Sequence, residues 1–264
     1  AYRSYKKGNK RMKKIINSLI IAFAMYSKIP TPRADWEKEN MRYVMCCFPL
    51  VGAVIGAFIY GWSYAAVRFG LSEGLRAAGY VLIPVFITGG IHLDGFLDTC
   101  DALHSYAPVE RKLEILKDPH TGAFAIICAC SLFAADFGLW SQVSVHGARA
   151  LSLGFVMSRC LSGWSVAVFP CAKNTGLAAT FHDAAHRRTV GILCGLELAA
   201  VLTLGCLLAP RETICMALAA GICVLWYGVM ARRQFGGITG DLAGWFLQMC
   251  ECLMALFVVI GELL

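Results

Sequence analysis

The chain has 264 residues, of which 58% are hydrophobic and 16% are charged, and its mean hydropathy is +0.62. A soluble core cannot bury that much apolar surface, so the composition excludes an ordinary soluble enzyme and indicates an all-α polytopic membrane protein. The net charge of +7 is concentrated near the N-terminus, where attraction to anionic lipid explains it, and nucleic acid is not an expected partner.

The N-terminal segment divides into a basic part and an apolar part. Residues 1–14 form a basic leader, either non-native or disordered, with Met12 as the expected start, and we set it apart from the fold. The apolar stretch from Ile15 to Met25 is too short to cross a bilayer, and its basic flank predicts a helix in the interface. Residues 15–264 contain no linker and are expected to form a single integral membrane domain.

Seven apolar runs are long enough to span a membrane as helices, and they lie near residues 47–67, 77–91, 122–145, 150–170, 190–209, 213–231 and 242–261. Nineteen of the 24 Lys and Arg residues precede the first run or follow the second, fourth and sixth, against four in the other loops. This asymmetry predicts that the N-terminus and those loops lie on the cytoplasmic side of the cell membrane. In the first run, Gly52 and Gly56 are four residues apart, which predicts close helix packing.

The second run leads into the most informative segment of the chain, which reads Gly89-Gly90-Ile-His92-Leu-Asp94-Gly95-Phe-Leu-Asp98-Thr-Cys-Asp101. In a helix, the three Asp residues fall at i, i+4 and i+7 and share one face. Three like charges so close together require a cation, and hard carboxylate ligands suit Mg²⁺. The alternative is a solvated acidic helix start, which the helix dipole favours.

The loop after this segment predicts a short surface helix between Pro108 and Asp118, because Pro suits a first turn and Pro119 ends the helix. Lys117 and Asp118, followed by His120, provide a cation, a carboxylate and an imidazole of the kind that a phosphate-and-metal site needs. A connector with exposed charges is the alternative.

Two charges inside apolar runs are candidates for function because an unpaired charge at that depth is expensive. Arg159 must contact a carboxylate, a cavity or a ligand, and either a site-lining role or a structural pair fits. Glu251 lies in the last run on the same helix face as Asp241. The turn Gly236-Gly237-Ile-Thr239-Gly240-Asp241 opens that run and suits an anion at a helix start.

The thirteen Cys residues lie mostly inside apolar runs and form no C-x-x-C pair. We interpret them as small buried hydrophobic residues in a reducing setting rather than as zinc ligands or disulfides.

Taken together, the Gly89–Asp101 segment, the segment Leu113-Glu-Ile-Leu-Lys-Asp-Pro-His-Thr-Gly-Ala-Phe124, the pair Ser158-Arg159 and the Gly236–Asp241 turn resemble the cobalamin synthase family, the adenosylcobinamide-GDP ribazoletransferases. The resemblance covers the chain from about Lys13 onward. It implies a Mg²⁺-dependent membrane transferase that joins adenosylcobinamide-GDP to α-ribazole or α-ribazole 5′-phosphate and releases GMP. A homo-oligomer is compatible with the sequence, which leaves the oligomeric state open.

The residue patterns and the family resemblance lead to one hypothesis for the site. In it, Asp94, Asp98, Asp101 and Asp241 hold Mg²⁺ at the pyrophosphate of adenosylcobinamide-GDP. His92 is the expected proton acceptor, and Lys117 and Arg159 are expected to bind phosphate oxygens. The other expected contacts to the nucleotide-bearing substrate are Gly89, Gly90, Asp118, Gly237, Thr239 and Glu251. The segment 172–188 matches no fixed pattern, and its His182, Asp183 and His186 are further candidates for substrate contact.

Two other functions remain open at this point. A CDP-alcohol phosphotransferase that makes phospholipid also uses aspartates at a cytoplasmic membrane face, but its pattern places Ala-Arg after Asp-Gly, whereas Phe96 and Leu97 follow here. A transporter would place its acids at mid-membrane and show repeat symmetry.

Overall fold

The computed structural model describes residues 2–172, 181 and 187–264, without the side chains of residues 2–11 and 38. The helices are α1 Tyr2–Tyr26, α2 Lys38–Met41, α3 Val44–Arg68, α4 Glu73–Thr88, α5 Ile91–His104, α6 Val109–Ile115, α7 Ala123–Gln142, α8 Val145–Val168, α10 Arg187–Leu208, α11 Pro210–Phe235 and α12 Gly240–Leu263. Within the described ranges there is no strand, only one isolated bridge between Cys171 and Ile238. The predicted all-α bundle is confirmed.

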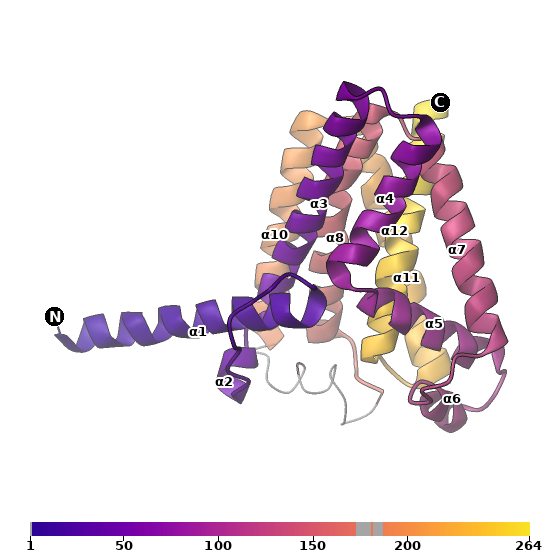
Figure 1. Cartoon of the computed structure of the whole chain (residues 1–264). Coiled ribbons are helices and arrows are strands. Elements are labelled where there is room, and N and C mark those ends of the chain that lie inside the picture. The colour runs from indigo at the N-terminus through magenta and orange to yellow at the C-terminus, as the bar shows by residue number, and fades with distance from the viewer. Residues whose placement is uncertain (1, 173–180, 182–186) are drawn as a thin grey trace.

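The membrane crossings agree with the seven predicted runs, with one difference at the second. The helices α3, α7, α8, α10, α11 and α12 are each long and apolar enough to cross a membrane, while α4 and α5 form a pair bent by 96°. The bend occurs at Gly89 and Gly90, whose φ angles of +66° and +81° are accessible mainly to glycine. We therefore treat α4 as a short seventh crossing and α5 as a helix that lies across the end of the bundle (Figure 1).

The elements predicted to share one side of the membrane gather at one end of the bundle. Figure 1 shows α1, α2, α5 and α6 at this end, whereas the α3–α4 connection and the C-terminus lie at the opposite end. The α5 helix packs against α12, and α6 packs against both α5 and α11. The acidic segment, the predicted surface helix and the turn before α12 are therefore neighbours.

The N-terminal helix is longer than the predicted one. It begins at Tyr2 rather than near Ile15, so in this structure the basic leader continues the helix. Lys and Arg are good helix formers, and no proline interrupts the segment. The helix runs sideways from the bundle, and it packs against α3, as an interfacial helix would (Figure 1).

The predicted close packing at Gly52 and Gly56 is confirmed, and the partner is α8. A Cβ atom at Gly52 would lie 2.2 Å from the carbonyl oxygen of Phe155, and one at Gly56 would lie 2.2 Å from that of Ser152. The two backbones thus approach more closely than any side chain would allow.

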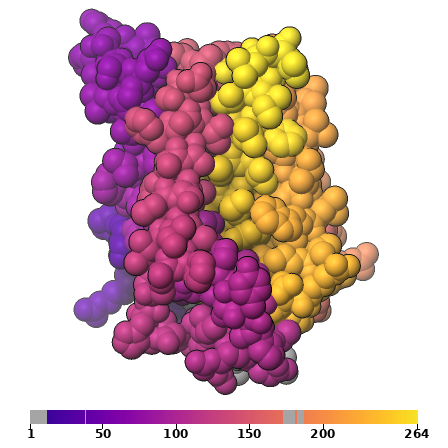
Figure 2. Space-filling view, turned by 90° about the vertical axis from the view of Figure 1, so that its right-hand side faces the viewer, coloured from indigo at the N-terminus to yellow at the C-terminus, as the bar shows by residue number. Residues whose placement is uncertain are grey.

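The outer helices present apolar side chains outward. Only 17% of the most apolar stretch of α7, and of α10, is buried inside the protein. Figure 2 shows α7, α12 and α11 side by side on one such face. Exposed side chains such as Leu196, Leu207 and Leu225 make this surface suited to lipid tails rather than to water.

We predict that Gly56→Ala forces α3 away from α8 and lowers the free energy of unfolding by about 1–3 kcal/mol. Thermal unfolding of the detergent-solubilised protein measures this change. Gly61→Ala is the matched control on the same helix, because a Cβ atom there meets nothing within 4 Å. Equal loss of stability in the two variants would contradict the packing argument.

Candidate active site

The acidic segment reaches the start of α12 through a close contact between α5 and α12. A Cβ atom at Gly95 would lie 2.7 Å from the carbonyl oxygen of Asp241, and one at Gly244 would lie 2.8 Å from that of His92. One glycine on each helix thus lets the two backbones touch. This contact joins the two sequence motifs that carry the predicted carboxylates.

The structure places the four predicted carboxylates at one end of the bundle. Asp94, Asp98 and Asp101 lie on the single helix α5, as predicted, and Asp98 lies within electrostatic reach of the charges of the other two and of Asp241. Asp94 and Asp241 line the same pocket. The result is a concentration of negative charge at one end of the bundle.

Asp101 accepts hydrogen bonds from the start of α7, which the spacing of the three aspartates did not predict. Its Oδ1 accepts a hydrogen bond of 2.8 Å from the backbone N–H of Ala125, and its Oδ2 accepts one from that of Gly122. Asp101 therefore caps the N-terminus of α7, where unpaired N–H groups favour a carboxylate. Gly122 makes the approach possible, since a Cβ atom there would lie 2.6 Å from Oδ2 of Asp101.

The donor set suits a metal ion that takes few protein ligands. Among the described residues, no three His, Cys, Asp or Glu side chains are arranged around one metal position. Magnesium commonly takes one or two carboxylates and completes its octahedron with water and substrate phosphate oxygens. Asp94 and Asp241, which line one pocket with Asp98 nearby, fit that kind of site.

The pocket beside these carboxylates has a volume of about 250 Å³. Its wall includes Tyr26 of α1, Phe48 of α3 and His92 of α5, whose rings contact one another. His92 is only 4% exposed, and its Nε2 has no hydrogen-bond partner in the described part of the chain. The imidazole thus has an unfilled hydrogen-bonding position at the wall of this pocket. Tyr26 and Phe48 were not among the predicted site residues. Each lies in an apolar stretch, and no local sequence pattern shows that either one contacts His92.

Arg159 and Glu251 form a buried ion pair. Arg159 is 1% exposed, and one of its terminal nitrogens donates to Oε1 of Glu251, to the hydroxyl of Ser158 at 2.9 Å and to the carbonyl of Phe155 at 3.1 Å. This is the structural pair that the sequence left open as one of two alternatives. It makes the predicted phosphate contact of Arg159 unfavourable, because moving Arg159 to a phosphate would leave the Glu251 carboxylate buried without its partner.

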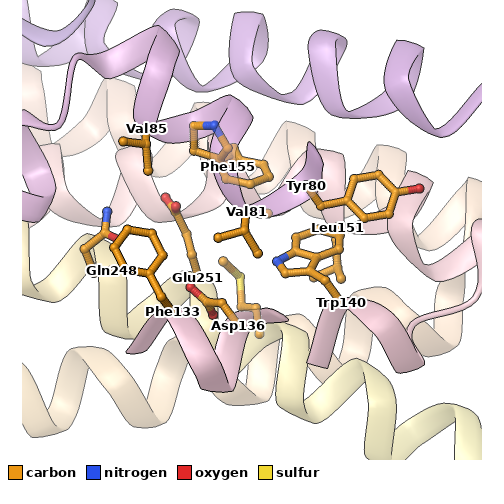
Figure 3. A pocket seen from close by; sticks show the side chains of 13 residues that line it. Tyr80, Val81, Val85, Phe133, Asp136, Trp140, Leu151, Phe155, Gln248 and Glu251 are labelled. Carbon is orange, nitrogen blue, oxygen red and sulfur yellow. The ribbon is translucent and has the colours of Figure 1, made fainter. Parts of the chain in front are cut away.

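Glu251 also lies away from the carboxylate pocket. It follows Asp241 by ten residues, which corresponds to about 15 Å along α12. Its side chain faces a separate small pocket between α4, α7, α8 and α12, near Gln248 and Asp136 (Figure 3). The structure therefore does not bring Glu251 together with Asp94 and Asp241, although the sequence placed it on the same helix face.

The Lys117–His120 segment is exposed at the end of α6. Oδ1 of Asp118 accepts hydrogen bonds from the backbone N–H of His120 at 3.0 Å and from its ring Nδ1 at 2.7 Å. These bonds lower the pKa of the Asp118 carboxyl. Asp118 thus shapes a surface turn, and neither it nor Lys117 lines the carboxylate pocket.

The glycines and the threonine of the two turns have local roles. Gly89 and Gly90 form the α4–α5 bend, and Gly89 also leaves room for the side chain of Lys28, whose Cε would lie 2.2 Å from a Cβ atom. At the other turn, a Cβ atom at Gly237 would lie 2.5 Å from the carbonyl oxygen of Pro170. Thr239 caps α12 by accepting a hydrogen bond of 3.2 Å from Leu242 N–H. Their predicted contact with substrate stays a prediction.

His182, Asp183 and His186 lie outside the described residues. The thirteen Cys residues are free thiols, and six of them are buried, whereas Cys130 and Cys206 are exposed.

Comparison with known proteins gives one consistent result. The family model for cobalamin-5-phosphate synthase matches residues 18–259. The chain is 46% identical over 249 residues to an adenosylcobinamide-GDP ribazoletransferase of Lachnoclostridium phytofermentans, covering 94% of this chain and 95% of the relative. It is 31% identical to proteins of the same name from Clostridium botulinum, covering 91% and 96%, and from Geobacillus kaustophilus, covering 92% and 95%. No solved structure matches.

We predict that Gly95→Ala separates α5 from α12, because its Cβ atom would meet backbone rather than a movable side chain. Backbone hydrogen exchange in the first turn of α12 should become faster. Gly221→Ala, where a Cβ atom meets nothing within 4 Å, should leave that exchange unchanged. Unaltered exchange in Gly95→Ala would mean that this contact does not hold the two helices together.

We also predict that Glu251→Ala lowers the free energy of unfolding by about 3–5 kcal/mol, since it leaves the Arg159 guanidinium buried without its carboxylate. The double variant Arg159→Met with Glu251→Leu should recover most of this stability, because apolar side chains of similar volume replace the pair. Thermal unfolding of both variants provides the measurement. A double variant no more stable than Glu251→Ala would refute the ion-pair explanation.

Proposed function

This chain belongs to the cobalamin-5-phosphate synthase family, and on that premise we propose that it is an adenosylcobinamide-GDP ribazoletransferase of the membrane. The reaction transfers the cobinamide phosphate of adenosylcobinamide-GDP to α-ribazole or to α-ribazole 5′-phosphate. GMP is released, and the product is adenosylcobalamin or its 5′-phosphate. The observation that carries this function is the family match over residues 18–259, together with relatives of that name aligned over more than nine-tenths of the chain.

The chemical step is a displacement at phosphorus. A ribose hydroxyl oxygen of ribazole forms a bond to the phosphorus next to the cobinamide arm, and the bond from that phosphorus to the oxygen of GMP breaks. The hydroxyl proton needs an acceptor. We assign this part to His92, because its Nε2 is buried, lacks a partner in the described residues and lies in the pocket that Asp94 and Asp241 line.

The proposed cofactor is Mg²⁺, which when bound would neutralise charge on the entering and leaving oxygens. Asp94 and Asp241 are the proposed ligands, and Asp98 is a third carboxylate within electrostatic reach of both. Asp101 holds the start of α7 and so contributes to the site by fixing α5 against α7.

The proposed location of the site is the cytoplasmic face of the cell membrane. The distribution of Lys and Arg supports this orientation, because the N-terminus and the loops at the carboxylate end carry most of the positive charge. Lipid is the proposed surrounding of the apolar outer helices and of α1.

The two rival functions are less well supported. The chain lacks the Ala-Arg that should follow Asp94-Gly95 in a CDP-alcohol phosphotransferase, and the family match is to a different family. The carboxylates that the structure gathers lie at one end of the bundle, whereas a transporter would be expected to place them near its middle.

An assay of the purified chain in lipid nanodiscs tests the function. The substrates are adenosylcobinamide-GDP and α-ribazole 5′-phosphate with Mg²⁺, and the readouts are GMP and the corrinoid product. Release of CMP from a CDP-alcohol, or uptake into vesicles without turnover, would instead support one of the rivals.

We predict that Asp94→Asn lowers kcat by about 100-fold or more, because a neutral amide would hold Mg²⁺ more weakly than a carboxylate does. The variant should unfold at the wild-type temperature, since Asp94 is exposed. Glu73→Gln, at the exposed start of α4 on the opposite end of the bundle, is the control and should retain full activity. Near-normal turnover by Asp94→Asn would eliminate the assignment of Asp94.

A further inference from the structure

The carboxylate pocket has a polar end and an apolar interior. Asp94 and Asp241 lie at the polar end. From Asp241, the lining continues along α12 through Ala243 and Gly244 to Leu247, which corresponds to about 9 Å along the helix axis. A molecule that fills the pocket therefore has one part near the carboxylates and another part among apolar side chains.

The interior is built to hold a flat ring. The rings of Tyr26 and His92 are stacked, with centroids 5.8 Å apart and planes inclined by 23°, and Phe48 contacts both of them at centroid distances of 4.3 Å and 5.7 Å. Apolar side chains from α8 and α12, including Val166 and Leu247, complete the lining. Aromatic walls of this kind favour a planar heterocycle by stacking and by burial of apolar surface.

We propose that this pocket binds the benzimidazole base of ribazole and thereby positions the acceptor nucleoside, an inference that rests on the proposed function. The base lies between the aromatic wall and the apolar side chains of α8 and α12. The ribose then lies toward Asp94 and Asp241, where the displacement takes place. A ribose hydroxyl beside His92 supplies the partner that its buried Nε2 lacks within the described residues.

The guanine of the other substrate fits the interior less well. Guanine carries an exocyclic carbonyl and an exocyclic amine, whereas a benzimidazole has neither. Away from the carboxylates, the described side chains that offer hydrogen bonds in this pocket are those of Tyr26, His92 and Ser162. Each guanine group left without a partner would cost about 1–3 kcal/mol. The mostly apolar lining thus suits the acceptor base, which has no exocyclic group that needs a hydrogen-bond partner.

Steady-state kinetics of a pocket-filling variant test the proposal. Ala243→Leu adds bulk at the apolar lining, and it should raise the KM for α-ribazole 5′-phosphate at least about tenfold. The KM for adenosylcobinamide-GDP should stay within about twofold of wild type. Ala199→Leu is the matched control, because it makes the same change on the exposed face of α10, outside this pocket. Val166→Leu fills the same pocket from α8, so the test does not depend on one variant folding.

Equilibrium dialysis with α-ribazole alone separates the subsite from the reaction. The wild-type protein should bind it, and Ala243→Leu should bind it at least about tenfold more weakly. A rise in the KM for adenosylcobinamide-GDP instead would place guanine in the pocket and overturn the proposal. Unchanged KM values for both substrates in two folded filling variants would also overturn it, and would leave the pocket to lipid.

The failures of the two proposals are distinguishable. If wild-type protein turns over both substrates while the filling variants behave like wild type, the transferase function stands and the base subsite is wrong. If wild-type protein produces neither GMP nor corrinoid product, the proposed function itself is wrong.

Discussion

The close contact of α5 with α12 is the constraint on which the site depends. Gly95 and Gly244 let two helix backbones touch, and no residue with a side chain fits at either position without displacing backbone. The bend at Gly89 and Gly90 turns α5 across the end of the bundle so that this contact can form. Carboxylates from two motifs far apart in the sequence therefore lie close together. The packing of α5 against α12 keeps them close despite their mutual repulsion.

The buried ion pair of Arg159 and Glu251 also stabilises the packing of the helices around the carboxylate pocket. Arg159 on α8 and Glu251 on α12 connect the two helices that carry much of the pocket wall, and the Arg159 guanidinium lies 6.0 Å from the centre of the Phe48 ring. Phe48 in turn contacts His92. A chain of contacts therefore runs from a charge pair inside the bundle to the imidazole at the site. An intramembrane charge need not touch substrate to matter for the site, because its pairing fixes the helices that do.

Much of the fold, and part of the site, could be predicted from local patterns in the sequence. Apolar length identifies the spans, the spacing of Gly52 and Gly56 identifies a packing face, and the density of Asp in one short segment identifies the end of the bundle where the carboxylates meet. What could not be predicted depends on contacts between distant segments. In the sequence, Asp101 is a candidate metal ligand in the same way as Asp94 and Asp98. Only the position of α7 shows that it caps that helix. The partner of Arg159 lies 92 residues away, and the sequence alone fits both a ligand contact and a structural pair.

The first helix is usually considered an anchor when it is basic and amphipathic, but here its last residue, Tyr26, forms part of the ring wall beside His92. The carboxylate pocket is thus completed by a helix that lies outside the transmembrane bundle. A chain cut back to its transmembrane helices would lose one side of this pocket, so the N-terminal helix belongs to the pocket as much as the bundle does.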